Sequence, residues 1–119
     1  MSQSSAQYHV FIKEILEYQK VWTIKDDQGF PSSPNSDGET AIPFWSLETR
    51  VEKILENVPR YRNFRVNEIT LDDFINKWLT GLEADGLYVG VNWSGKSATG
   101  YDIKPKDVRK RIKFEGKID

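Results

Sequence analysis

The chain has 119 residues, with 17 basic and 18 acidic side chains, one His and no Cys. This length predicts a single domain, residues 1–119, that buries about two-thirds of its unfolded surface without disulfides or metals. The composition excludes thiol nucleophiles and Cys-ligated metal centres, and the lone His9 cannot form a multi-His site. We therefore expect no metal and no cofactor. The lack of a signal peptide and of any run of ~20 apolar residues predicts a cytoplasmic protein with no membrane contact.

Basic side chains are concentrated at the C-terminal end. Residues 104–119 hold 7 basic and 3 acidic side chains, which leaves 10 and 15 in residues 1–103. Nucleic-acid binding through this basic segment is one alternative function. Asp107 and Glu115 interrupt the segment, and Phe114 is its single aromatic residue, so the sequence argues against a nucleic-acid partner.

Apolar spacing in the first half predicts helix and strand in alternation. A helix capped by Ser4 or Ser5 extends to about residue 19, and the β-branched run 21–24 predicts a short strand before a turn at 26–29. Residues 31–39 read as a loop. Residues 41–45 predict a short or edge strand, because Pro43 lacks a donor, and Ser46 is the expected N-cap of a helix that Pro59 ends.

The second half contains the clearest helix. Period-two alternation predicts a strand over 64–69, and Thr70 can cap a helix through Asp73, with Asp85-Gly86 as its C-terminal cap. A hairpin of strands 87–93 and 99–103 follows, and Pro105 opens a last helix through residue 113. The order α-β-β-α-β-α-β-β-α predicts an α+β fold: a small, mainly antiparallel sheet of four to five short strands packed against three to four helices.

One segment matches the phosphate-loop pattern, with Gly90, Gly95, Lys96 and Ser97 at the required spacing. Such a loop needs a strand that ends at the first Gly and a helix that begins at the Lys-Ser pair. Here the strand pattern continues through Gly90 and the residues after Ser97 lack helical spacing, so we interpret the segment as a hairpin. An alternative function stays open: the protein could bind a nucleotide or another small ligand, or be an enzyme, through residues 90–97. Lys96 and Ser97 would then be the phosphate ligands.

Other polar clusters have ordinary structural explanations. Asn35, Asp37 and Glu39 alternate as calcium ligands do, but the loop lacks a carboxylate at its twelfth position and Asx turns explain the same residues. The carboxylate pairs at 26–27 and 72–73 belong to a turn and a helix start. We therefore predict no catalytic residue.

Aromatic residues are more informative, since they make up 13% of the chain. Six of them are predicted on strands or at strand–loop junctions, and Trp and Tyr near a rim are typical recognition anchors. We predict a binding surface at Trp22, Trp45, Trp93 and Tyr101. The leading interpretation is a non-enzymatic module that binds another protein, and unpaired strand edges also permit a homodimer.

Four segments together resemble the small bacterial proteins grouped as domain of unknown function 2750. They are residues Tyr8–Leu16, Val21–Thr23, Pro43–Ser46 and Gly86–Trp93, the last of which is the most distinctive. The resemblance covers nearly the whole chain. It implies a compact bacterial protein, without an established activity, cofactor or catalytic residue to transfer.

Overall fold

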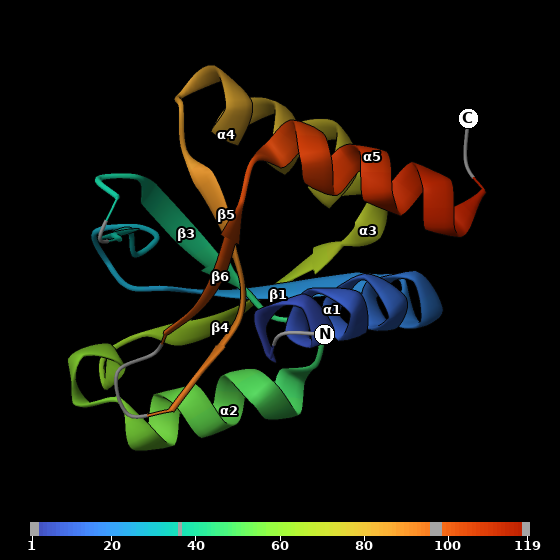
Figure 1. The fold of residues 1–119 in the computed structure, drawn as a ribbon. Coiled ribbons are helices and arrows are strands. Elements are labelled where there is room, and N and C mark those ends of the chain that lie inside the picture. Colours follow the sequence, from blue (N-terminus) through green and yellow to red (C-terminus); the bar gives the residue numbers. More distant parts are fainter. Residues whose placement is uncertain (1–2, 36, 96–98, 118–119) are drawn as a thin grey trace.

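The computed structural model describes residues 3–35, 37–95 and 99–117. A short 3-10 turn, Pro59–Tyr61, and a π-helical segment, Phe74–Trp78, accompany the regular elements. The helices and strands, in chain order, are α1 Gln3–Tyr18, β1 Lys20–Lys25, β2 Ser33–Pro34, β3 Thr40–Phe44, α2 Glu48–Asn57, β4 Arg65–Thr70, α3 Leu71–Asp73, α4 Leu79–Ala84, β5 Tyr88–Ser94, β6 Thr99–Ile103 and α5 Pro105–Gly116 (Figure 1).

The strands form two sheets. β1 and β4 pair antiparallel, and a second sheet has the order β2-β3-β5-β6, in which only the β3–β5 pair is parallel. Backbone bonds between Trp22 and Trp45, at 2.8 and 2.7 Å, join the two sheets. The α+β class is confirmed. The expected single sheet is divided in two, and the expected loop at 31–39 contributes the two-residue strand β2.

Strand β3 is short, as predicted, but it lies inside its sheet. Its antiparallel pairing with β2 ends at Ala41, and the bridge to β1 begins at Trp45. Pro43 lies between these two pairings, and its carbonyl accepts a hydrogen bond from the Thr23 hydroxyl at 2.7 Å. An internal strand tolerates Pro43 because its missing backbone N–H lies at a position where β3 has no antiparallel partner.

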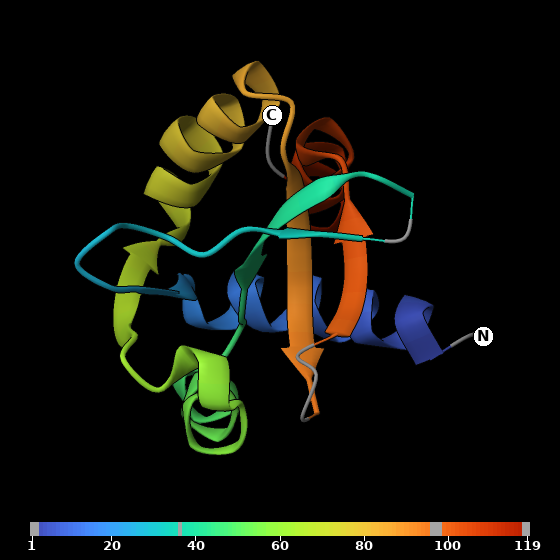
Figure 2. The same ribbon diagram turned by 90° about the vertical axis from the view of Figure 1, so that its left-hand side faces the viewer.

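The core has two parts on opposite faces of the sheets. Helices α1, α3, α4 and α5 cover one part, which includes Phe11, Phe44 and Val91. Helix α2 covers the other, which includes Trp45 and Trp93. Figures 1 and 2 show α2 at one end of the molecule and α4 and α5 at the other, with β5 and β6 running between them.

Of four predicted helix caps, two are present and two are not. Helix α1 already includes Gln3, so Ser4 and Ser5 lie within it and the prediction that one of them caps it is wrong. Thr70 caps its helix by accepting from the Asp73 N–H at 3.1 Å. Gly86, at φ 69°, ends α4 in a Schellman motif, since the Leu87 N–H bonds the Leu82 carbonyl at 2.9 Å. Ser46 was expected to cap α2, and that prediction is wrong, because the N-cap is Leu47 with no side-chain bond. Ser46 is instead fully buried in a polar cluster described below.

Candidate functional site

The phosphate-loop match does not produce phosphate-loop geometry. Strand β5 continues through Gly90 and, with β6, forms the predicted hairpin. The register shifts between Val91 and Ser94, where Asn92 adopts a left-handed φ of 48°. This bulge resets the side-chain alternation, so that Trp93 lies on the same side as Gly90 rather than beside Val91. Gly90 is small because the Trp93 indole covers it: a Cβ there would lie 2.5 Å from the ring.

The four aromatic residues predicted as anchors do not converge on a surface. Trp45 and Trp93 are 0% and 4% exposed, so the rim expected around them is core. Hydrogen bonds hold both indoles, from Trp45 Nε1 to the Trp93 carbonyl at 2.8 Å and from Trp93 Nε1 to Asp102 at 3.0 Å. Trp22 is half-buried in the same cluster. Tyr101, 39% exposed, lies apart on β6 with its ring 5.9 Å from Tyr8.

The remaining sequence motifs have structural roles where they are described. Asn35 Oδ1 accepts from the N–H groups of Asp37 and Glu39 at 2.9 and 3.0 Å, an Asx-type turn. Lys96 and Ser97 lie outside the described residues. Among residues 3–35, 37–95 and 99–117 there is no group of three His, Asp or Glu side chains arranged to hold a metal. Within the same residues, no helix is both long and apolar enough to span a bilayer.

The basic C-terminal segment is helix α5, and part of its charge is used in packing. Arg109 bonds Glu83 and Thr80 of α4 at 3.3 and 3.0 Å. Arg111 pairs with Glu115 at 3.0 Å and lies over the Tyr8 ring. Exposed lysines and Phe114 occupy the outer side of the helix.

A buried polar cluster links α1, α2 and the bulge. The Ser46 hydroxyl donates to Glu14 at 2.6 Å, and the Ser46 N–H donates to Asn92 Oδ1 at 3.0 Å. Arg50 donates two hydrogen bonds to the Glu14 carboxylate, at 3.1 and 3.3 Å, and the Gln7 side chain donates to the Asn92 carbonyl. No buried side-chain N or O atom in the described part of the chain lacks a partner. The cluster therefore stabilises the left-handed Asn92 without leaving a polar group unsatisfied.

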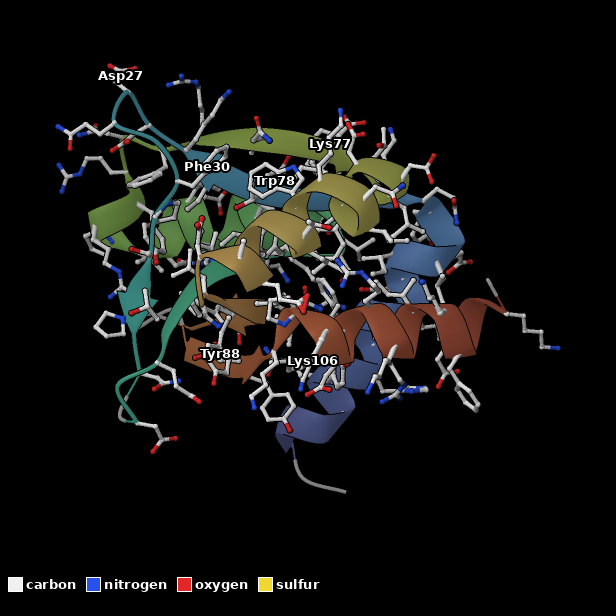
Figure 3. All side chains as sticks on the ribbon, turned by 90° about the horizontal axis from the view of Figure 1, so that it is seen from above. Asp27, Phe30, Lys77, Trp78, Tyr88 and Lys106 are labelled. Carbon is white, nitrogen blue, oxygen red and sulfur yellow. The ribbon has the colours of Figure 1, made fainter. Side chains whose placement is uncertain are left out.

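An apolar groove opens at the other end of the molecule, beside α4. We call it the Trp78 groove. Its volume is about 240 Å³. Phe30, which is 40% exposed, stands edge-on to Trp78 with ring centroids 4.8 Å apart, and Figure 3 shows the two rings side by side near Lys77. The groove is lined by Ile42, Lys77, Trp78, Gly81, Leu82, Asp85 and Leu87.

Three local features shape this groove. The helix between Leu71 and Ala84 changes to π-helical geometry over Phe74–Trp78, and such segments are common at functional sites. The Schellman motif after α4 brings Leu87 beside Leu82 at the groove wall. Gly81 lies in the following turn of helix, where a Cβ would meet no atom within 4 Å. Packing therefore does not require a glycine at this position.

Two tyrosines have shifted pKa values outside the groove. Burial raises the pKa of Tyr8 to about 12, although the Arg111 guanidinium opposes the shift. A hydrogen bond to Glu39 raises the pKa of Tyr88, and bonds from Asn35 and Tyr88 lower the pKa of the Glu39 carboxyl. Neither tyrosine lines the Trp78 groove, so these shifts do not indicate acid–base chemistry there.

A family model described as "Protein of unknown function (DUF2750)" matches residues 8–112. The chain belongs to the DUF2750 family. The match begins within α1 and ends within α5, so the DUF2750 region contains every strand, α2 and the Trp78 groove. The resemblance stated from the sequence is thus confirmed. A search of curated proteins finds no match to this chain.

Sequence reasoning missed the Trp78 groove. Trp78 has the helical spacing of a core residue, and Phe30 is one of several aromatic residues near the predicted strands. Gly81 was the available signal, because a glycine inside a helix costs about 1 kcal/mol relative to Ala. Neither the π-helical segment nor the proximity of Phe30 to Trp78 has a recognisable sequence pattern.

Proposed function

We propose that this protein is a non-enzymatic interaction module whose Trp78 groove receives one large apolar side chain of a partner protein. The main support for this proposal is Gly81. Its presence weakens the helix by about 1 kcal/mol, no neighbouring atom requires it, and it adds no side chain to the lining of the groove. A helix weakened with no packing reason at an apolar groove supports a role in binding.

The size of the groove supports an amino-acid side chain as the occupant. Its volume of about 240 Å³ is below the range of roughly 300–1,000 Å³ typical of small-molecule sites. Interface energy is concentrated in a few apolar or aromatic anchors that fill pockets rimmed by polar groups. Trp78 and Leu82 provide apolar walls, and Lys77 and Asp85 place both signs of charge at the rim. We place this interaction in the cytoplasm, as the lack of Cys favours.

Affinity capture with matched variants tests the proposal. Gly81→Leu adds a large apolar side chain at a residue that lines the groove, and Asn76→Leu adds the same side chain at an exposed position of this helix that does not line it. We expect a protein from lysate of the source organism to be retained by wild type and by Asn76→Leu, and lost from Gly81→Leu. Equal retention by all three proteins would overturn the assignment of the groove. A second copy of this chain as the retained protein would identify a homodimer, which size-exclusion chromatography with light scattering would then measure.

A further inference from the structure

A second cavity lies against α2, whereas the Trp78 groove lies beside α4. Figure 1 shows these two helices at opposite ends of the molecule. We call the cavity against α2 the Arg50 cavity. It is formed by one side of α2 and the end of β5 after the bulge, and its volume is about 430 Å³. This volume lies within the range of roughly 300–1,000 Å³ found for small-molecule sites. The two cavities therefore differ in the size of occupant that they admit.

Two basic side chains line the Arg50 cavity, and the charge of one of them, Arg50, is paired with the Glu14 carboxylate. Arg50 and Lys53 both contribute, together with Thr49 and Asn57, and no carboxylate is among its lining residues. Glu14 lies behind Arg50 and accepts bonds from its Nε and Nη2. Since a guanidinium carries five N–H donors, three remain beyond those two bonds. The Glu14 contact thus fixes the guanidinium in place while leaving donors for a ligand.

The polar cluster behind this wall positions Arg50, whose side chain is 39% exposed, through its two bonds to Glu14. Glu14 is itself held by the Ser46 hydroxyl, and Ser46 by Asn92, which keeps its left-handed φ of 48°. Asn is among the non-glycine residues that adopt this region most readily, so the backbone at Asn92 is uncommon but carries little strain. Binding sites are effective when their polar groups are positioned before the ligand arrives. The buried cluster provides that positioning for Arg50.

Apolar side chains complete the cavity. Trp93, turned to this side by the bulge, and Ile54 of α2 line it with little exposed surface, and Leu47, the N-cap residue of α2, is half-buried beside them. We propose that the Arg50 cavity binds a small organic anion, with a phosphate or carboxylate group on Arg50 and Lys53 and an apolar body against Trp93. Arginine binds such planar or tetrahedral anions through paired N–H groups. This assignment is independent of the protein-binding role of the Trp78 groove.

Phenyl phosphate is a suitable probe, because it combines both parts of the expected ligand. Titration followed by 1H–15N correlation spectra should shift the amides of residues 92–95 and the Trp93 indole signal. Inorganic phosphate should bind more weakly, and phenol, which lacks the charge, should cause little shift at the same concentration. No shift at these residues with phenyl phosphate at about 10 mM, or equal shifts with phenol, would overturn the proposal.

Variants distinguish binding in the Arg50 cavity from nonspecific attraction of the anion to surface lysines. Lys53→Met, at an exposed position, should weaken phenyl phosphate binding about tenfold. Arg50→Lys keeps the charge but removes the paired donors, and should also weaken it. The control is Lys110→Met, an exposed lysine of α5 that does not line the cavity. If Lys110→Met weakened phenyl phosphate binding as much as Lys53→Met does, binding would not be specific to the Arg50 cavity. Thermal unfolding of each variant checks that the fold is retained.

Discussion

Replacing Gly90 by Ala tests whether this glycine exists for packing or for phosphate. The added Cβ would lie 2.5 Å from Trp93 Cε2 and Cζ2, whereas ordinary contacts begin near 3.4 Å. The indole must therefore move by about 0.9 Å, the difference between those two distances. Trp93 has little freedom to do so, because it is buried and bonded to Asp102.

The expected cost follows from two effects. Overpacking of a core costs about 1–3 kcal/mol, and loss of the Trp93–Asp102 hydrogen bond adds about 1 kcal/mol. We expect Gly90→Ala to lower the free energy of unfolding by about 2–4 kcal/mol, measured by urea denaturation followed by circular dichroism.

A double-mutant cycle identifies the cause. In a Trp93→Leu background the Cβ no longer meets an indole, so Gly90→Ala should cost at least about 1 kcal/mol less than in wild type. If Gly90→Ala were as stable as wild type, or if its cost were unchanged without Trp93, the packing explanation would be refuted. A phosphate-loop glycine would instead show normal stability and altered nucleotide affinity.

Three further predictions concern other parts of the molecule. Gly81→Ala should raise the free energy of unfolding by about 0.5–1 kcal/mol, since the added methyl meets open space; a destabilised variant would show that packing does require this glycine. Asn92→Gly keeps the left-handed backbone but removes the acceptor of the buried Ser46 N–H, so denaturation should show a loss of about 1–3 kcal/mol, and unchanged stability would contradict the role of the cluster. Because burial raises the pKa of Tyr8 to about 12 from 10.0, the unfolded chain releases this proton first and stability should fall as pH rises from 10 to 12. Denaturation across that range should show a smaller fall in Tyr8→Phe.

Local patterns in the sequence determined much of the fold. The Thr70 cap, the Gly86 cap and the start of α5 at Pro105 each depend on a residue whose effect is confined to its own helix end. These three predictions are confirmed. The hairpin of β5 and β6 was likewise predictable from alternation and a turn.

Long-range contacts explain the errors. Ser46 has the side chain of a good N-cap, but Asn92 and Glu14, distant in sequence, bind it instead. A regular strand would place Trp93 on the same side as Val91, and the bulge at Asn92 turns it to the other side. Period-two patterns assume a regular strand and cannot show where one residue becomes left-handed.

The candidate sites depended on the same kind of contact. The Trp78 groove requires Ile42 of β3 to lie beside Trp78 and Leu82, and the Arg50 cavity requires α2 to meet the end of β5. Composition predicted an aromatic surface, but Trp45 and Trp93 are buried, and the exposed Phe30 instead packs against the half-buried Trp78. Neither partner in such a contact is identifiable before the chain is folded.

The central claim is that Gly81 keeps a protein-binding groove open at a cost in stability. The most direct test of this claim is isothermal titration of the captured partner against wild type, Gly81→Leu and Asn76→Leu. The free energy of unfolding of each protein is measured as well. We predict at least a tenfold loss of affinity in Gly81→Leu, about 1.4 kcal/mol or more, with stability equal to or above wild type and with Asn76→Leu binding normally. Normal affinity in Gly81→Leu would contradict the claim.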